Sequence, residues 1–168
     1  PRTRAVVVEN TSNAGGGGVW PDALFDSVAD ACDTHGLTLH IDGARLMNAA
    51  VAHGVSPSRW GARATTVQLC FSKGLGCPFG AVLAMPKALA WRARRLKQAL
   101  GGALRQSGVI AGAMLYALDH QLERLAEDHA RAQRLGEGLG ALAGLEVEPV
   151  ETNLVFFRPE GARLEAHA

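Results

Sequence analysis

Residues 37–49 read LTLHIDGARLMNA, a largely apolar segment that is interrupted by an aspartate, a glycine and an arginine. The first part, residues 37–41, has the length and the side chains of a buried strand, and residues 45–52 have the apolar spacing of a short helix. Asp42 stands at the junction between them. An aspartate in this place either caps the helix that follows or presents its carboxylate to a ligand, and this one stretch leaves both possibilities open.

Strands and helices alternate on both sides of this stretch. We predict strands at 5–8, 37–41, 65–71, 80–85 and 152–158, and helices at 22–35, 45–52, 87–100, 106–120 and 122–142. The helix at 106–120 is rich in Ala, Gly, Leu and Val, which predicts that it is buried on most sides. The alternation predicts an α/β fold, in which helices cover both faces of a mostly parallel sheet. Ligands of such sheets bind beyond the carboxyl ends of the strands.

The bulk composition excludes several classes of protein. Of the 168 residues, 48% are hydrophobic and 20% charged, which is typical of a globular protein. A net charge of +1 gives no electrostatic reason to expect nucleic acid or a membrane surface as a partner. No apolar stretch approaches the roughly 18 residues of a membrane span, and the opening residues do not resemble a signal peptide. The three cysteines follow no metal-ligand spacing, so we expect reduced thiols, no metal site and a cytoplasmic location.

Lys73 is the first candidate for chemistry. It follows the apolar strand 65–71, in the loop SKGLGCPFG at residues 72–80, whose glycines let the backbone bend closely around a ligand. A partly desolvated lysine there would have a lowered pKa and a neutral amine, which covalent chemistry with a carbonyl compound requires. Taken alone, a loop lysine is more often a solvated surface charge. The glycines fit neither a dinucleotide fingerprint nor a P-loop, so a nucleotide-binding module is disfavoured.

Asp42 gives the lysine a partner. The two residues follow different strands of the same predicted sheet, so they can reach opposite sides of one ligand. A carboxylate beside a pyridine nitrogen keeps that nitrogen protonated, which makes the ring an electron sink. The pair therefore favours a ligand over a helix cap as the role of Asp42.

The chain carries further motifs in a fixed order. They are ENTSN at 9–13, WP at 20–21, LHIDGARLMNA at 39–49, SKGLGCPFGAVL at 72–83, LGGALRQSGV at 100–109, RLAEDHARAQRL at 124–135 and ETNLVFFR at 151–158. In this combination the chain resembles the pyridoxal-phosphate enzymes of the aspartate-aminotransferase fold, and within them the threonine aldolases. The resemblance covers nearly the whole chain.

The resemblance implies a role for each of five residues. Lys73 is similar to the lysine that attaches the cofactor, pyridoxal 5'-phosphate, through its aldehyde, and Asp42 to the partner of the pyridine nitrogen. Arg45 resembles a cofactor-site arginine that binds the substrate carboxylate. Arg105 resembles the arginine that reaches the cofactor phosphate of a neighbouring subunit. Ser12 stands where the family usually has a histidine near the substrate hydroxyl, which puts substrate preference in doubt.

The resemblance also implies the extent of the chain within a longer family protein. Residues 1–120 would form the second half of the cofactor-binding large domain, residues 121–143 a long interdomain helix, and residues 144–168 the beginning of the small C-terminal domain. The implied assembly is a homodimer or homotetramer with the active site at the subunit interface.

The implied reaction is the retro-aldol cleavage of L-threonine or L-allo-threonine to glycine and an aldehyde. Two alternatives stay open. One is a related β-eliminating lyase with the same cofactor, and the other is a truncated, inactive piece that acts only through interactions.

Overall fold

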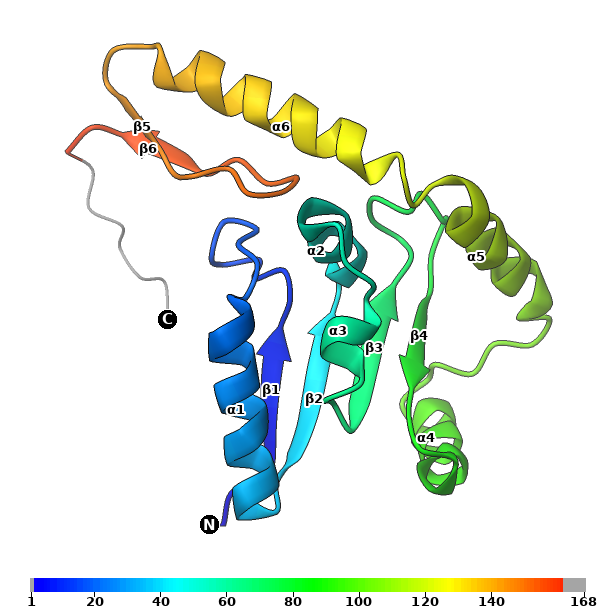
Figure 1. Ribbon diagram of the computed structural model, residues 1–168. Coiled ribbons are helices and arrows are strands. Elements are labelled where there is room, and N and C mark those ends of the chain that lie inside the picture. The colour runs from blue at the N-terminus through cyan, green and yellow to red at the C-terminus, as the bar shows by residue number, and fades with distance from the viewer. Residues whose placement is uncertain (1, 162–168) are drawn as a thin grey trace.

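The computed structural model describes residues 2–161 of the chain. Four strands form one sheet in the order in which they occur in the sequence (Figure 1). β1 (Ala5–Glu9), β2 (Thr38–Gly43) and β3 (Thr66–Cys70) run parallel, and β4 (Ala81–Ala84) runs antiparallel to β3. The prediction of a mostly parallel α/β sheet is therefore confirmed.

Helices connect and extend the sheet. Within the described residues they are α1 (Asp22–His35), α2 (Leu46–His53), α3 (Ser58–Gly61), α4 (Lys87–Ala99), α5 (Gly108–His120) and α6 (Leu125–Gly140). The bounds of α1 agree with the prediction because its buried residues, Phe25, Ala29 and Cys32, recur every three or four positions. Gly36 ends it with a left-handed backbone, φ 61°, which glycine adopts without a steric penalty.

The main core lies between the sheet and helices α1 to α3. Its buried side chains come from the strands and from the helices: Val8, Leu39, Ile41 and Val67, and Phe25, Ala29, Cys32, Leu46, Ala49, Ala50 and Trp60. Phe25, Ile41 and Trp60 have no exposed surface, so this cluster fixes where the strands end. This packing holds the ends of β1, β2 and β3 next to one another.

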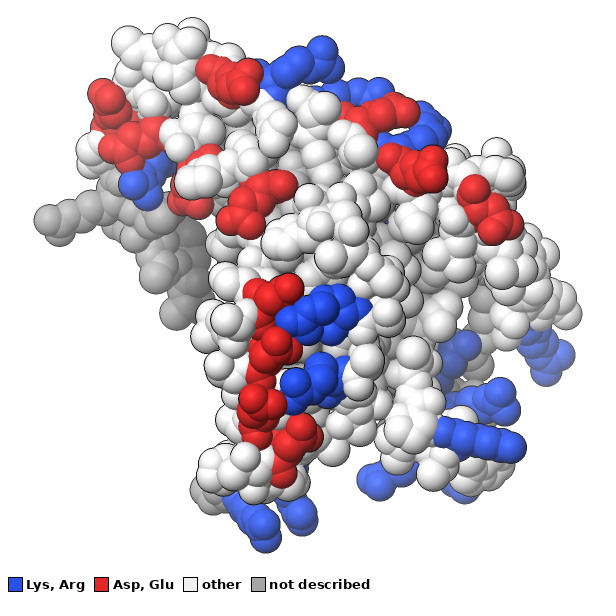
Figure 2. All heavy atoms as spheres, viewed as in Figure 1, with Lys and Arg blue, Asp and Glu red and all other residues white. Residues whose placement is uncertain are grey.

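An ion-pair ladder joins α1 to the α3 region on the outer surface. Arg59 donates to both carboxylate oxygens of Asp26, at 3.1 and 2.8 Å, and also lies 3.3 Å from Asp22. Arg63 pairs with Asp30 at 2.6 Å. Figure 2 shows the acidic row and the basic groups beside it. The hydrogen bond from Arg59 holds the pKa of Asp26 below its usual value.

A second, smaller core forms around the loop that follows β3. Phe71, Leu75 and Cys77 of this loop are buried together with Ala117 of α5 and Leu125 of α6. This cluster anchors the loop that carries Lys73. It also brings the end of α5 and the start of α6 onto the carboxyl side of the sheet.

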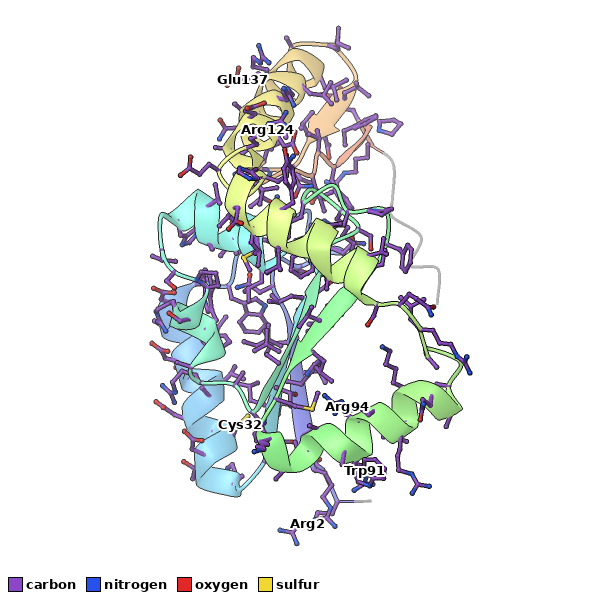
Figure 3. All side chains as sticks on the ribbon, turned by 90° about the vertical axis from the view of Figure 1, so that its right-hand side faces the viewer. Arg2, Cys32, Trp91, Arg94, Arg124 and Glu137 are labelled. Carbon is purple, nitrogen blue, oxygen red and sulfur yellow. The ribbon has the colours of Figure 1, made fainter. Side chains whose placement is uncertain are left out.

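The prediction that helix 106–120 is buried on most sides is wrong. Only Ile110 and Ala117 of α5 are buried, whereas Val109 is 75% and Leu115 63% exposed. The helix touches the second core along one narrow stripe, and the described residues offer no other surface to cover its remaining apolar side chains (Figure 3).

The predicted strand at 152–158 is also wrong over most of its length. Only β6 (Phe157–Pro159) is a strand, and it pairs antiparallel with β5 (Leu145–Val147), which is too short for its pattern to be recognised. Thr152 instead turns toward residues 16–18 and is completely buried there. A tertiary hydrogen bond thus replaces the ladder that the sequence pattern favoured.

Among residues 2–161, no helix combines the length and the apolar character needed to cross a membrane. Residues 162–168, the end of the predicted C-terminal segment, lie outside the described part of the chain.

Candidate active site

The carboxyl ends of the three parallel strands lie side by side. Glu9 of β1 is in register with Asp42 of β2, and Asp42 with Gln68 of β3. The backbone N–H of Asn10 donates to the carbonyl of Asp42 at 3.0 Å, which extends the pairing one residue beyond β1. This edge of the sheet therefore brings polar side chains from separate strands together, as the sequence predicted for Asp42.

Asp42 is half-buried and does not cap a helix. Its Oδ1 accepts the backbone N–H of Ala44 at 3.1 Å, a local turn contact that fixes the carboxylate. Helix α2 begins only at Leu46, and Arg45, at its N-cap position, makes no side-chain cap bond. Within residues 2–161 no hydrogen-bond donor meets the second oxygen, Oδ2, so that oxygen is available to a ligand.

The loop after β3 holds Lys73 on a fixed backbone. Its ends are tied by hydrogen bonds from Phe71 N to the Gly80 carbonyl and from Cys77 N to the Phe71 carbonyl, both 3.0 Å. Gly76 N donates to the Lys73 carbonyl at 2.8 Å, and the positive φ of Gly76, 73°, makes that tight turn possible. Lys73 itself is exposed, so the partial desolvation expected from the sequence is not found within the described residues, although the backbone of Lys73 is held.

Lys73 and Arg45 share one hollow. Its lining runs from Gly43 to Asn48 and includes Cys70 and residues 73–75, so it begins directly after Asp42. Its volume is only about 10 Å³, room for about one water molecule, so it shows that these residues are neighbours and is not itself the space for a cofactor. The structure thus places three of the five predicted site residues, Asp42, Arg45 and Lys73, in and beside one depression at the strand ends. A cation, an amine and a carboxylate in this arrangement suit a ligand that carries both anionic and carbonyl groups.

Ser12 and Arg105 do not line that hollow. Ser12 Oγ accepts the N–H of Gly15 at 3.1 Å and borders a separate depression formed with Gly18, Val19, Trp20, Pro21 and Leu24. Arg105 is exposed in the connection between α4 and α5, and borders another hollow with Trp91, Arg94 and Lys97 of α4 (Figure 3). Within one chain, these two residues are thus not grouped with Lys73.

Several buried polar atoms at the strand ends have no partner among the described residues. They are Nδ2 of Asn10, Oγ1 of Thr11 and Oε1 of Gln68. Each unsatisfied buried group costs about 1–3 kcal/mol unless water or a ligand meets it. Together with Asp42 Oδ2, they make this edge fit a polar ligand better than an apolar one. Sequence reasoning missed Asn10 and Gln68, although the polar run directly after β1 was a usable signal.

Asn48, which lines the hollow, forms a buried hydrogen-bonded pair with His129. Asn48 Nδ2 lies 3.1 Å from His129 Nε2, and both side chains are buried. Burial lowers the pKa of the His129 imidazole below its usual value of 6.5, so the neutral ring accepts from Asn48. The pair joins α2 to α6 beside Gly74, where an added Cβ would lie 2.7 Å from Leu125 Cδ2. Sequence reasoning found no role for His129, because nothing local indicates its distant partner.

The fold of the described residues is the aspartate-aminotransferase fold. The chain matches an aspartate aminotransferase structure from Thermus thermophilus with a TM-score of 0.66 and 21% identity, over 92% of this chain and 41% of that one. Residues 1–161 match the family model described as beta-eliminating lyase, and the chain belongs to that family.

The relatives include threonine aldolases. Low-specificity L-threonine aldolase 1 of Arabidopsis thaliana is 41% identical over 169 residues, which cover 99% of this chain and 47% of the relative. A threonine aldolase structure from Leishmania major has a TM-score of 0.75 at 20% identity, over 91% of this chain and 45% of that one, a likeness of fold alone. The chain therefore spans about half the length of the curated relatives it matches.

Proposed function

We propose that the complete protein cleaves L-threonine or L-allo-threonine to glycine and an aldehyde, with pyridoxal 5'-phosphate as its cofactor. The observation that carries the proposal is that Lys73 and Arg45 are neighbours at the strand ends, directly after Asp42, in a member of this family. Relatives from Arabidopsis thaliana and Escherichia coli are low-specificity L-threonine aldolases, which supports the choice of substrate.

Lys73, Asp42 and Arg45 each have a distinct role in the proposal. Lys73 would hold the cofactor through its aldehyde, and Asp42 Oδ2 would hold a proton at the pyridine nitrogen. Arg45 would bind the substrate carboxylate through its planar guanidinium. The bound cofactor supplies an electron sink for the bond that breaks at the substrate α-carbon. The loop after β3 keeps Lys73 in place while its side chain moves.

The remaining expectations belong to the same proposal. Ser12 would lie near the substrate hydroxyl, and Arg105 would serve the phosphate site of a neighbouring subunit in a homodimer or homotetramer. The exposure of Arg105, away from the Lys73 hollow, supports a role between subunits. We also retain the division at residues 1–120, 121–143 and 144–168. Three cysteines without a disulfide support a cytoplasmic location.

The products distinguish the proposed retro-aldol cleavage from the alternative reaction, β-elimination. The beta-eliminating lyase family is named after this alternative. The chain would be supplied with the part of the Arabidopsis relative that it does not span, and incubated with cofactor and L-threonine. Retro-aldol cleavage releases glycine and acetaldehyde, whereas β-elimination releases a 2-oxo acid and ammonia. We expect glycine and acetaldehyde in equal amounts, and no turnover with Lys73→Ala. A 2-oxo acid as the main product would contradict the proposal.

A further inference from the structure

We propose that Glu151 and Thr152 are positioning residues that clamp the glycine loop, residues 12–18, beside the active site. This inference rests on the proposed function. It gives a role to two sequence motifs that have none in the proposed reaction. They are the four consecutive glycines and the ETN segment at 151–153.

The glycine loop closes on itself through backbone hydrogen bonds. Ser12 N donates to the Gly18 carbonyl at 3.0 Å, and Gly17 N donates to the Ser12 carbonyl at 2.8 Å. Gly18 N donates to the Gly15 carbonyl at 3.1 Å. These bonds define the loop's shape, but all of them lie within one short surface segment. A loop held only by such local bonds opens readily, because few buried contacts oppose the opening.

The C-terminal segment supplies the missing long-range contacts. The hydroxyl of Thr152 donates to the Gly17 carbonyl at 2.7 Å, and Thr152 is completely buried. The backbone N–H of Val19 donates to Glu151 Oε2 at 2.9 Å. These contacts join residues more than 130 positions apart, and Figure 1 shows the segment before β6 beside the loop that follows β1.

Gly17 allows Thr152 to approach the loop closely. Gly17 has a φ of 83°, and a Cβ there would lie 2.7 Å from Thr152 Oγ1 and 3.1 Å from Leu154 Cβ. Thr152 can therefore approach the loop only because residue 17 has no side chain. The fit is specific to the pair, since a merely flexible glycine loop needs no such close neighbour.

The clamp acts at the edge where Asp42 lies. The glycine loop continues directly from Asn10 and Thr11, which are completely buried, and the N–H of Asn10 donates to the Asp42 carbonyl. The loop begins with Ser12, the proposed neighbour of the substrate hydroxyl, whose Oγ accepts the N–H of Gly15 within the loop. The clamp would therefore fix the position of Ser12 relative to the strand end that carries Asp42, through contacts that do not involve Lys73.

The test uses two pairs of variants in the 168-residue chain. Thr152→Val removes the donor and keeps the shape, and Thr152→Ser restores the donor. Glu151→Ala removes the acceptor at an exposed residue, where misfolding is not expected, and Glu151→Gln restores an acceptor. Thr34→Val is the matched control, because the hydroxyl of Thr34 also donates to a backbone carbonyl, that of Asp30, but on distant α1.

Two readouts separate positioning from general stability. Amide exchange at residues 12–19 should rise about tenfold in Thr152→Val and in Glu151→Ala, as the loss of one ordinary hydrogen bond predicts, while exchange in α1 stays unchanged. With the remainder of the Arabidopsis relative supplied, KM for threonine should rise about as much, at unchanged cofactor affinity. Thr152→Ser and Glu151→Gln should restore both.

Unchanged loop exchange in both disruptive variants, or an equal rise throughout the chain, would overturn the clamp. If no protein, including the wild type, binds cofactor or cleaves threonine, the proposed function fails, and the exchange data alone decide on the clamp. The two failures are thus distinguishable.

Discussion

At the scale of single residues, the proposed function depends on side chains that stand at the ends of strands. Asp42 and Lys73 were recognisable from the sequence, because a carboxylate and a lysine that each follow an apolar strand must lie at the same edge of a parallel sheet. Arg45 was predicted only from the family resemblance, and the structure places it three residues after Asp42, in the lining that it shares with Lys73. Gln68 was missed because only the register of the strands reveals that it borders this edge, whereas the polar run after β1 was a usable signal for Asn10.

Replacing Asp42 should reduce turnover far more than it reduces binding. The carboxylate is fixed by the Ala44 N–H and keeps its other oxygen for the cofactor, so its loss removes the partner of the pyridine nitrogen. We expect Asp42→Ala to lower kcat/KM for threonine by about 10²-fold or more, the scale on which a misplaced proton acts. Asp119→Ala, at an exposed residue near the end of α5, is the control. Activity of Asp42→Ala near that of the wild type would refute the assigned role.

At the scale of elements, the predictions were right where the periodicity of apolar residues determines the structure. They were wrong where contacts between distant segments determine it. Helix α1 was placed correctly because one face packs on the sheet and a glycine ends it. The burial of α5 was mispredicted because composition does not say how much surface the rest of the described chain offers. The strand at 152–158 was mispredicted because the hydrogen bond of Thr152 to the glycine loop is invisible in a local pattern.

The buried pair between α2 and α6 should make stability depend on pH. Because the pKa of His129 is lowered in the fold, the unfolded chain binds more protons below the usual value of 6.5, and stability falls as the pH falls through that value. We expect the Tm to drop between pH 7 and pH 5.5, and to drop less in His129→Gln, which stays neutral. Equal drops in both proteins, measured by thermal unfolding, would show that His129 does not contribute.

At the scale of the whole molecule, the chain presents a strand-end site with a well-packed core beneath it, and apolar surface elsewhere. Trp91 and Leu96 of α4, Leu100 directly after it, and Val109 and Leu115 of α5 are each more than half exposed. The chain also spans about half of its curated relatives. Neither the composition nor the periodicity of the sequence indicates this exposed surface, because both describe the side chains and not what surrounds them.

The lysine count makes the central claim directly testable. The chain contains three lysines, and the two others, Lys87 and Lys97, lie on α4. α4 follows the antiparallel strand β4, which ends opposite the start of β3, so Lys87 lies at the other edge of the sheet from Lys73. A covalent bond between the cofactor aldehyde and a lysine produces a visible absorbance band. The decisive measurement is a titration with pyridoxal 5'-phosphate of the wild type, Lys73→Ala and the Lys87→Ala/Lys97→Ala double variant.

Each protein would be titrated alone and with the part of the Arabidopsis relative that the chain does not span. With that part present, the account predicts a saturable band in the wild type and in the double variant, and none in Lys73→Ala. An equal band in Lys73→Ala, or no band in any of the three proteins, would contradict it.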